Sequence, residues 1–148
     1  MKNILLMVFA LIMTNSIITL KASGQVSSVE PSAKQHKIVF QLTTDDTLAH
    51  RSLMKQLNNI TTVATDTKIE VVCHGPGLNM LVLNKTTVHD KILQMKGKGI
   101  VFVACEFSMS ERKITKENII PEAGYVKAGI IEIVSKQEQG WSYIKSGF

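Results

Sequence analysis

The apolar segment from Ile100 to Ala104 restricts the possible folds of this chain more than any other stretch of its sequence. Its residues, Ile-Val-Phe-Val-Ala, are mostly β-branched or aromatic, and no polar residue interrupts them. Such a run is typical of a central strand that is buried on both faces of a parallel sheet. The run ends at Cys105, so we expect this thiol at the carboxyl end of the strand, where open α/β sheets bind their ligands.

Segments of strand type and of helical type alternate along the rest of the chain. The other strand candidates are the segments 37–42, 68–73, 125–126 and 141–144. Helical spacing of apolar residues follows the capping residues at 43–46 and recurs over 87–96 and 128–137, with a capped helical turn at 115–120, while residues 78–83 fit either a short helix or a buried run. In the segment 128–137 the apolar positions are Ile130, Ile131 and Val134. This alternation predicts an α/β fold, a three-layer α/β/α sandwich with a mostly parallel sheet.

The N-terminus has the residue order of a secretory signal peptide. A lysine precedes the apolar run from Ile4 to Met13, and small residues follow at 22–24. An uncleaved anchor is the alternative, but a spanning helix needs about 20 mostly apolar residues, and this run is shorter and interrupted. We expect a signal peptide over 1–24, a flexible tether over 25–36 and one domain over 37–148. The mature protein would be periplasmic or secreted, without a stable membrane span.

The net charge of +5 says little about partners. The lysines are scattered along the chain, whereas nucleic-acid-binding proteins usually show a clustered basic surface. The sequence also contains no phosphate-binding loop, dinucleotide-binding glycine motif or hydrolase nucleophile elbow. We therefore expect no nucleic-acid partner and no cofactor.

Cys105 is the leading candidate for chemistry because of its position. A helix that begins just after this residue would stabilise the thiolate through its free N–H groups and its dipole. Glu106 opposes thiolate formation if its carboxylate points at the sulfur, unless it acts as a general acid or lies in solvent. The alternative is that Cys105 is a small apolar residue that only fills space.

Cys73 ends the preceding strand, and the next four residues are His74, Gly75, Pro76 and Gly77. Because glycine lets the main chain approach a ligand closely, this loop is a candidate rim of a pocket. In an oxidising compartment, two cysteines form a disulfide or are maintained as reactive thiols. If the two strands are adjacent, both sulfurs lie at one edge of the sheet and Cys73 is a possible redox partner of Cys105; an intervening strand would hold them too far apart.

A metal site is not favoured by the spacing of the candidate ligands. There is no C-x-x-C or H-x-x-x-H motif. The adjacent residues Cys73 and His74 would also point to opposite faces of an extended strand. The sequence therefore predicts no metal site.

Taken in order, these motifs resemble the DsrE/DsrF-like family, including its exported members. The resemblance covers nearly all of residues 37–148, and the segments that carry it are His74–Gly77, Val103–Met109, Ile114–Lys116, Ile119–Pro121, Val126–Gly129 and Gly140–Ile144. It implies a parallel five-stranded sheet in an α/β/α sandwich and assembly as a homo-oligomer, a trimer or a hexamer. In the sulfur-relay members a cysteine carries sulfur as a persulfide between partner proteins, and by motif position that role falls on Cys105.

The chain departs from the exported members of this family at two places. They often carry Asn-Thr where this chain has Phe107-Ser108, and often a small residue where it has Cys73. The first difference bears on the polarity of the expected pocket. The second makes any role of Cys73 specific to this sequence.

Three hypotheses follow. In the first, an exported protein handles sulfane sulfur, with Cys105 as the catalytic residue and a sulfur-transfer protein as a partner. The expected substrate-binding residues are His74, Gly75, Pro76, Gly77, Glu106 and Met109. In the second, the chain is a non-enzymatic oligomeric module that binds a small ligand or a protein, and Cys105 is structural. In the third, Cys73 and Cys105 form a redox pair.

Overall fold

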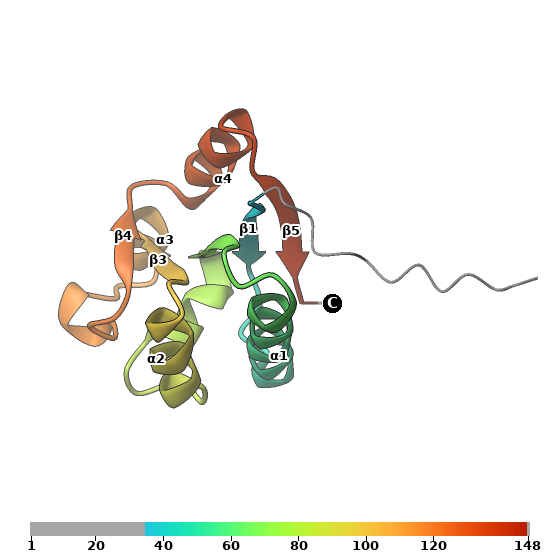
Figure 1. Cartoon of the computed structure of the whole chain (residues 1–148). Helices are drawn as coiled ribbons and strands as arrows, with labels where there is room; N and C mark the ends of the chain where they lie inside the picture. Colours follow the sequence, from blue (N-terminus) through green and yellow to red (C-terminus); the bar gives the residue numbers. More distant parts are fainter. Residues whose placement is uncertain (1–34, 148) are drawn as a thin grey trace, which may run out of the picture.

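The computed structural model describes residues 35–147, in which strands alternate with helices (Figure 1). The predicted signal peptide over 1–24 and most of the predicted tether lie outside the described residues. Within 35–147, no helix is both long enough and apolar enough to cross a membrane. In chain order the elements are β1 (Lys37–Leu42), α1 (Thr47–Val63), β2 (Lys68–Cys73), the 3-10 helix η1 (Gly75–Leu81), α2 (His89–Gly97), β3 (Val101–Cys105), α3 (Glu106–Glu111), the 3-10 helix η2 (Lys116–Asn118), β4 (Gly124–Val126), α4 (Gly129–Glu138) and β5 (Ser142–Ser146).

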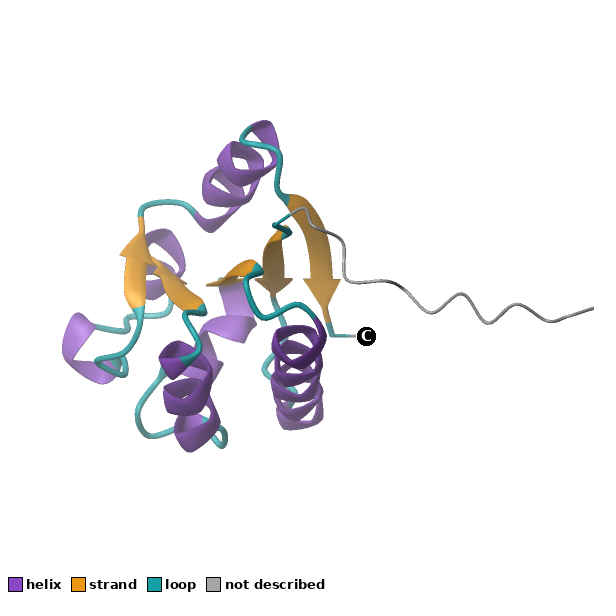
Figure 2. Cartoon of the chain, viewed as in Figure 1, coloured by secondary structure: helices purple, strands orange, loops and turns teal. Residues whose placement is uncertain are grey.

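The strands form one parallel sheet. Their order is β4-β3-β2-β1-β5, and every neighbouring pair is parallel. Helices α1 and α2 lie on one face of the sheet, and α4 lies on the other (Figures 1 and 2). This architecture confirms the predicted three-layer α/β/α sandwich with five parallel strands. The apolar run at 100–104 becomes the interior strand β3, and Cys105 is its last residue.

The larger core lies between the sheet and helices α1 and α2. Alternate strand residues face it, among them Phe40 and Phe102. The other residues of each strand point to the opposite face, toward α4. There Val72 and Val103 pack with Ile133 in a smaller core. Since neighbouring residues of a strand point to opposite faces, one step along the chain decides which layer a side chain joins.

Helix α1 begins and packs as the sequence predicts. The carboxylate of Asp46, the residue before the helix, accepts a hydrogen bond from the N–H of Leu48 at 2.8 Å. This contact satisfies one of the N–H groups that have no partner inside the helix. Leu53 and Leu57, four residues apart, are fully buried against the sheet.

The sequence is less clear about three shorter helical segments. The ambiguous stretch at 78–83 belongs largely to η1, a 3-10 helix that starts directly after His74. The capped turn predicted at 115–120 is η2, in which Thr115 and Asn118 form a reciprocal capping box. Helix α3 is only six residues long, and it begins at the residue after Cys105.

Helix α4 buries a different face from the one that its apolar residues suggest. The prediction of a helix here depends on the spacing of Ile130, Ile131 and Val134. Their exposed fractions are nevertheless 53%, 63% and 43%. Ile133 is buried against the sheet instead. The helix is therefore partly apolar on its outer surface.

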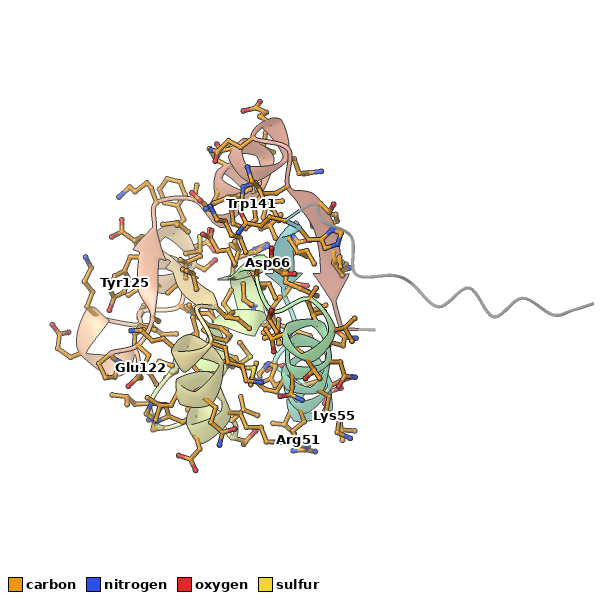
Figure 3. The ribbon with its side chains drawn as sticks, in the orientation of Figure 1. Arg51, Lys55, Asp66, Glu122, Tyr125 and Trp141 are labelled. Atoms are coloured by element: carbon orange, nitrogen blue, oxygen red, sulfur yellow. The ribbon has the colours of Figure 1, made fainter. Side chains whose placement is uncertain are left out.

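An ion pair attaches the second half of α4 to the sheet. The Nζ atom of Lys136 lies 2.7 Å from the Oε2 atom of Glu70 on β2 and 4.6 Å from the ring centre of Trp141, which follows the helix (Figure 3). Burial raises the pKa of Glu70, and Lys136 opposes that rise. The net contribution of such a pair to stability is small, because the free energy needed to bury both charges offsets much of their attraction.

Candidate functional site at the end of β3

Cys105 lies at the junction of β3 and α3, on the α4 face of the sheet. Ala104, one residue earlier, packs in the larger core, so strand alternation turns Cys105 to the other side. There its Sγ atom accepts a hydrogen bond from the backbone N–H of Gly129, the first residue of α4, at 3.2 Å. The side chain is only 4% exposed.

A hollow of about 290 Å³ opens over this thiol. The two residues that follow β2, His74 and Gly75, form part of its wall. The other lining residues are Cys105, then Phe107, Ser108 and Glu111 of α3, and residues 128–130 at the start of α4. Phe107 and Ile130, at the rim, are 54% and 53% exposed. The hollow thus has a mainly apolar wall, with a sulfur atom and a few polar side chains in its lining.

A groove of similar size, about 310 Å³, lies between α1 and α2. Its lining includes Met54, Lys55 and Lys91, and Figure 3 shows Lys55 on α1. None of its lining residues is a cysteine, a histidine or a carboxylate. We therefore place the chemistry in the hollow over Cys105.

The surroundings of Cys105 favour its thiolate. Burial alone would raise the pKa of the thiol, but the backbone N–H groups of Ser108, Gly129 and Phe107 and the Ser108 side chain together hold that pKa below its ordinary value. Hydrogen bonds to an anion favour the charged form, and here they outweigh desolvation. The oxygen of the Ser108 hydroxyl also accepts a hydrogen bond from the N–H of Gly75 at 2.8 Å. That contact leaves the hydroxyl hydrogen available for the sulfur.

We expect alkylation of Cys105 by iodoacetamide to rise with pH around a midpoint below the ordinary thiol pKa of about 8.5, because only the thiolate reacts. Replacing Ser108 by alanine removes one donor and should move the midpoint upward by about one pH unit, which slows the reaction near neutrality. The rate is measured by intact mass against pH. Ser110→Ala, an exposed position on the same helix, is the matched control. An unchanged midpoint in Ser108→Ala would contradict a role of this hydroxyl.

The structure brings together three of the residues predicted for the site. Cys105, His74 and Gly75 all line the hollow. Pro76 and Gly77 lie outside this lining: Pro76 is exposed, and Gly77 is buried against the backbone at the end of β1.

Met109 and Glu106, also predicted as substrate-binding residues, lie outside the lining of the hollow. Met109 packs in the larger core on the far side of α3. The carboxylate oxygens of Glu106 lie 3.4 Å from the Nζ atom of Lys116 and 3.5 Å from that of Lys127. These lysines, Lys116 foremost, lower the pKa of Glu106. Its negative charge is therefore paired at the surface.

Cys73 and Cys105 end adjacent strands, but their side chains lie on opposite faces of the sheet. In the register of β2 and β3, Cys73 is opposite Ala104, and both of these residues pack in the larger core. Cys105 is one step further along, on the α4 face. Cys73 is completely buried, burial raises its pKa well above the ordinary value, and both cysteines are free thiols. The fold thus does not bring the two sulfur atoms together.

Sequence reasoning missed several residues of the hollow, of which Ser108, Glu111 and Gly129 matter most. Ser108 carried a signal, because it comes one helical turn after Cys105 and its side chain returns toward the start of α3. Gly129 carried none that is local. A β-carbon at Gly129 would lie 3.1 Å from Cβ of His74 and 3.3 Å from Cβ of Cys105, so any larger residue would have to push these side chains back by a few tenths of an ångström. Among residues 35–147, no three His, Cys, Asp or Glu side chains gather closely enough to hold a metal ion.

These features define a class: a parallel α/β protein with a hydrogen-bonded cysteine at the carboxyl edge of its sheet. The model of the DsrE/DsrF-like family matches residues 36–146, and the chain belongs to that family. No curated protein matches the chain.

Two solved structures share this fold. One is a protein of unknown function, MTH1491, from Methanobacterium thermoautotrophicum, with a TM-score of 0.71 and 24% identity over 75% of this chain and 99% of that one. The other is a conserved protein of unknown function, BT1422, from Bacteroides thetaiotaomicron, with a TM-score of 0.62 and 21% identity over 74% of this chain and 93% of that one. At these identities the likeness extends to the fold.

Proposed function

We propose that this protein accepts sulfane sulfur on Cys105 as a persulfide and passes it to a partner protein. One observation carries the proposal: the Sγ atom of Cys105 lies at a hollow of about 290 Å³, where backbone N–H groups and the Ser108 hydroxyl lower its pKa. A thiolate is the nucleophilic form of cysteine. Membership of a family that includes sulfur-relay proteins supports the same chemistry.

The step needs no external oxidant. The Cys105 thiolate attacks the outer sulfur of a persulfide or polysulfide donor, a new sulfur–sulfur bond forms, and the donor's own sulfur–sulfur bond breaks. The electron pair of the broken bond leaves with the donor, which departs as a thiolate. Attack by an acceptor thiolate on the outer sulfur of the Cys105 persulfide reverses the sequence and regenerates the Cys105 thiolate. The donor is thus a thiolate after it has given up its sulfur, and the acceptor is a thiolate before it receives one.

The apolar surface beside the hollow supports contact with another protein. Phe107 and Ile130 at the rim are about half exposed, and Ile131 and Val134 extend this surface along α4. Exposed apolar patches of this kind commonly mark interaction sites. We propose that this surface is covered by a sulfur-transfer partner or by further copies of the chain in a trimer or hexamer. We also propose that the protein is exported to the periplasm or to the medium.

Intact-mass measurement after incubation of the reduced protein with polysulfide tests the proposal. We expect wild type and Cys73→Ser to gain the mass of one sulfur atom and Cys105→Ser to gain none. Cys73→Ser is the matched control, since the change is the same and the residue faces the other side of the sheet. An unmodified wild-type protein would overturn the proposal, and equal gain by Cys105→Ser would remove Cys105 from it. Either result would favour the alternative of a binding module with a structural Cys105.

A further inference from the structure

Three neighbouring strands place a chain of hydrogen bonds on the α4 face of the sheet. The hydroxyl of Tyr143 on β5 donates to the Oε1 atom of Gln41 on β1. The Nε2 atom of Gln41 lies 2.8 Å from the Nε2 atom of His74, which follows β2. The middle residue, Gln41, is two residues after Val39 of the smaller core, so it points to the same face.

The Gln41 amide turns its oxygen toward Tyr143 and its NH2 group toward His74, and this orientation indicates where the His74 ring carries its proton. A side-chain amide nitrogen carries two hydrogens and accepts none, so the Nε2 atom of His74 must accept the bond from Gln41. The ring is then neutral, and its one proton is on Nδ1. Burial lowers the pKa of His74, which agrees with a neutral ring.

The same ring is part of the wall around Cys105. His74 and Cys105 both line the hollow, and the Cβ atoms of both lie against Gly129. The ring therefore has an acceptor nitrogen occupied by Gln41 and a donor nitrogen, Nδ1, that forms no hydrogen bond with another residue of 35–147. Besides Cys105 and His74, the lining contains one further ionisable side chain, Glu111, and an ionised carboxylate only accepts hydrogen bonds. An anion in the hollow would thus find its side-chain donors in His74 and Ser108.

We propose that Gln41 and Tyr143 are positioning residues that hold His74 as an Nδ1–H donor for the terminal, anionic sulfur of a persulfide on Cys105. This inference rests on the proposed function. His74 forms no covalent bond in this role and transfers no proton: it donates a hydrogen bond to the sulfur that Cys105 has received. A hydrogen bond to a charged group in a partly buried site contributes more than one between neutral groups.

Gln41→Glu is the variant that reverses the arrangement at nearly constant shape. A carboxylate in place of the amide accepts hydrogen bonds from both Tyr143 and His74, so a neutral ring must carry its proton on Nε2, which leaves Nδ1 without a proton for the sulfur. A doubly protonated ring would keep the Nδ1–H donor, and Gln41→Glu should then retain persulfide as wild type does. Gln94→Glu makes the same charge change on α2, across the sheet from the site, and is the matched control. Tyr143→Phe is a second variant at a half-exposed position, and it removes only the hydroxyl that orients the Gln41 amide.

The experiment combines two measurements on the purified, reduced protein. Nitrogen-15 NMR of the His74 ring reports which nitrogen carries the proton. Intact mass after polysulfide treatment and removal of excess reagent reports how much persulfide is retained. We expect the Nδ1–H form in wild type and in Gln94→Glu, a shifted proton in Gln41→Glu with about tenfold less retained persulfide, and mixed forms with an intermediate loss in Tyr143→Phe.

Two results would overturn the inference alone: an Nε2–H ring in wild type, or a Gln41→Glu variant whose ring carries its proton on Nε2 only and that still retains persulfide as wild type does. When wild type takes up sulfur in the same series, neither result affects the proposed function. A wild-type protein that takes up no sulfur, measured in the same series, would instead overturn the proposed function, and the inference would fall with it.

Discussion

Replacing Gly77 by alanine is expected to destabilise the protein by about 3 kcal/mol, the upper part of the usual range for overpacking a filled interior. A β-carbon at this position would lie 2.3 Å from the carbonyl oxygen of Leu42 and 2.8 Å from the backbone nitrogen of Thr43. Both contacts are with backbone at the end of β1, which cannot rotate away as a side chain could. The start of η1 would have to move off the sheet edge, and the loop from His74 would move with it.

The free energy of unfolding, measured in urea for wild type, Gly77→Ala and Gly97→Ala, checks this expectation. Gly97→Ala is the control, because a β-carbon there meets nothing within 4 Å and the residue is the last of α2. That substitution should be neutral or stabilise by up to about 1 kcal/mol, given the higher helix propensity of alanine. Equal stability of Gly77→Ala and wild type would show that η1 is not held against β1 in this way.

The second large effect concerns the two thiols of the native protein. We expect iodoacetamide to modify Cys105 at least about a hundredfold faster than Cys73, since Cys73 becomes reachable only when the structure opens. Cys73 is 0% exposed inside the larger core, and its raised pKa leaves almost no thiolate. Cys105 has a lowered pKa and lines an open hollow. Peptide mapping of the alkylated protein over time measures both rates.

Denaturation supplies the control for this contrast. In denaturant the two cysteines should react at similar rates, as both become ordinary thiols in an unfolded chain. Rapid modification of Cys73 in the native state, or a Cys73–Cys105 disulfide formed by mild oxidant without loss of structure, would contradict the opposite-face arrangement. Such a disulfide would also support the hypothesis that Cys73 and Cys105 form a redox pair.

Much of the fold could be predicted because its signals are local. The run at 100–104 marks an interior strand by composition alone, and Asp46 with Leu53 and Leu57 marks the start and the buried face of α1. Helix α4 shows where such signals fail. Its apolar residues Ile130 and Ile131 face outward, while Ile133 packs on the sheet and Gly129 lies against His74 and Cys105, so the buried face depends on contacts with residues far away in the chain.

The sequence anticipates part of the geometry of the candidate site. Cys105, His74 and Gly75 lie together at the hollow, because the ends of parallel strands meet at one edge of the sheet. Met109 packs in the larger core instead, because its direction depends on how α3 packs on the core. Residues close in sequence to a nucleophile need not point the same way.

Taken by itself, the sequence determined the alternation of strands and helices, and it placed a cysteine where a buried strand ends. These are properties of short segments, set by side-chain type and backbone preference. Only the tertiary structure decided that Cys73 and Cys105 face opposite sides, that Gly129 donates to the sulfur, and that Tyr143 and Gln41 reach His74. These three features depend on strand register or on contacts between residues far apart in the chain. Register and long-range contacts cannot be read from a local sequence pattern.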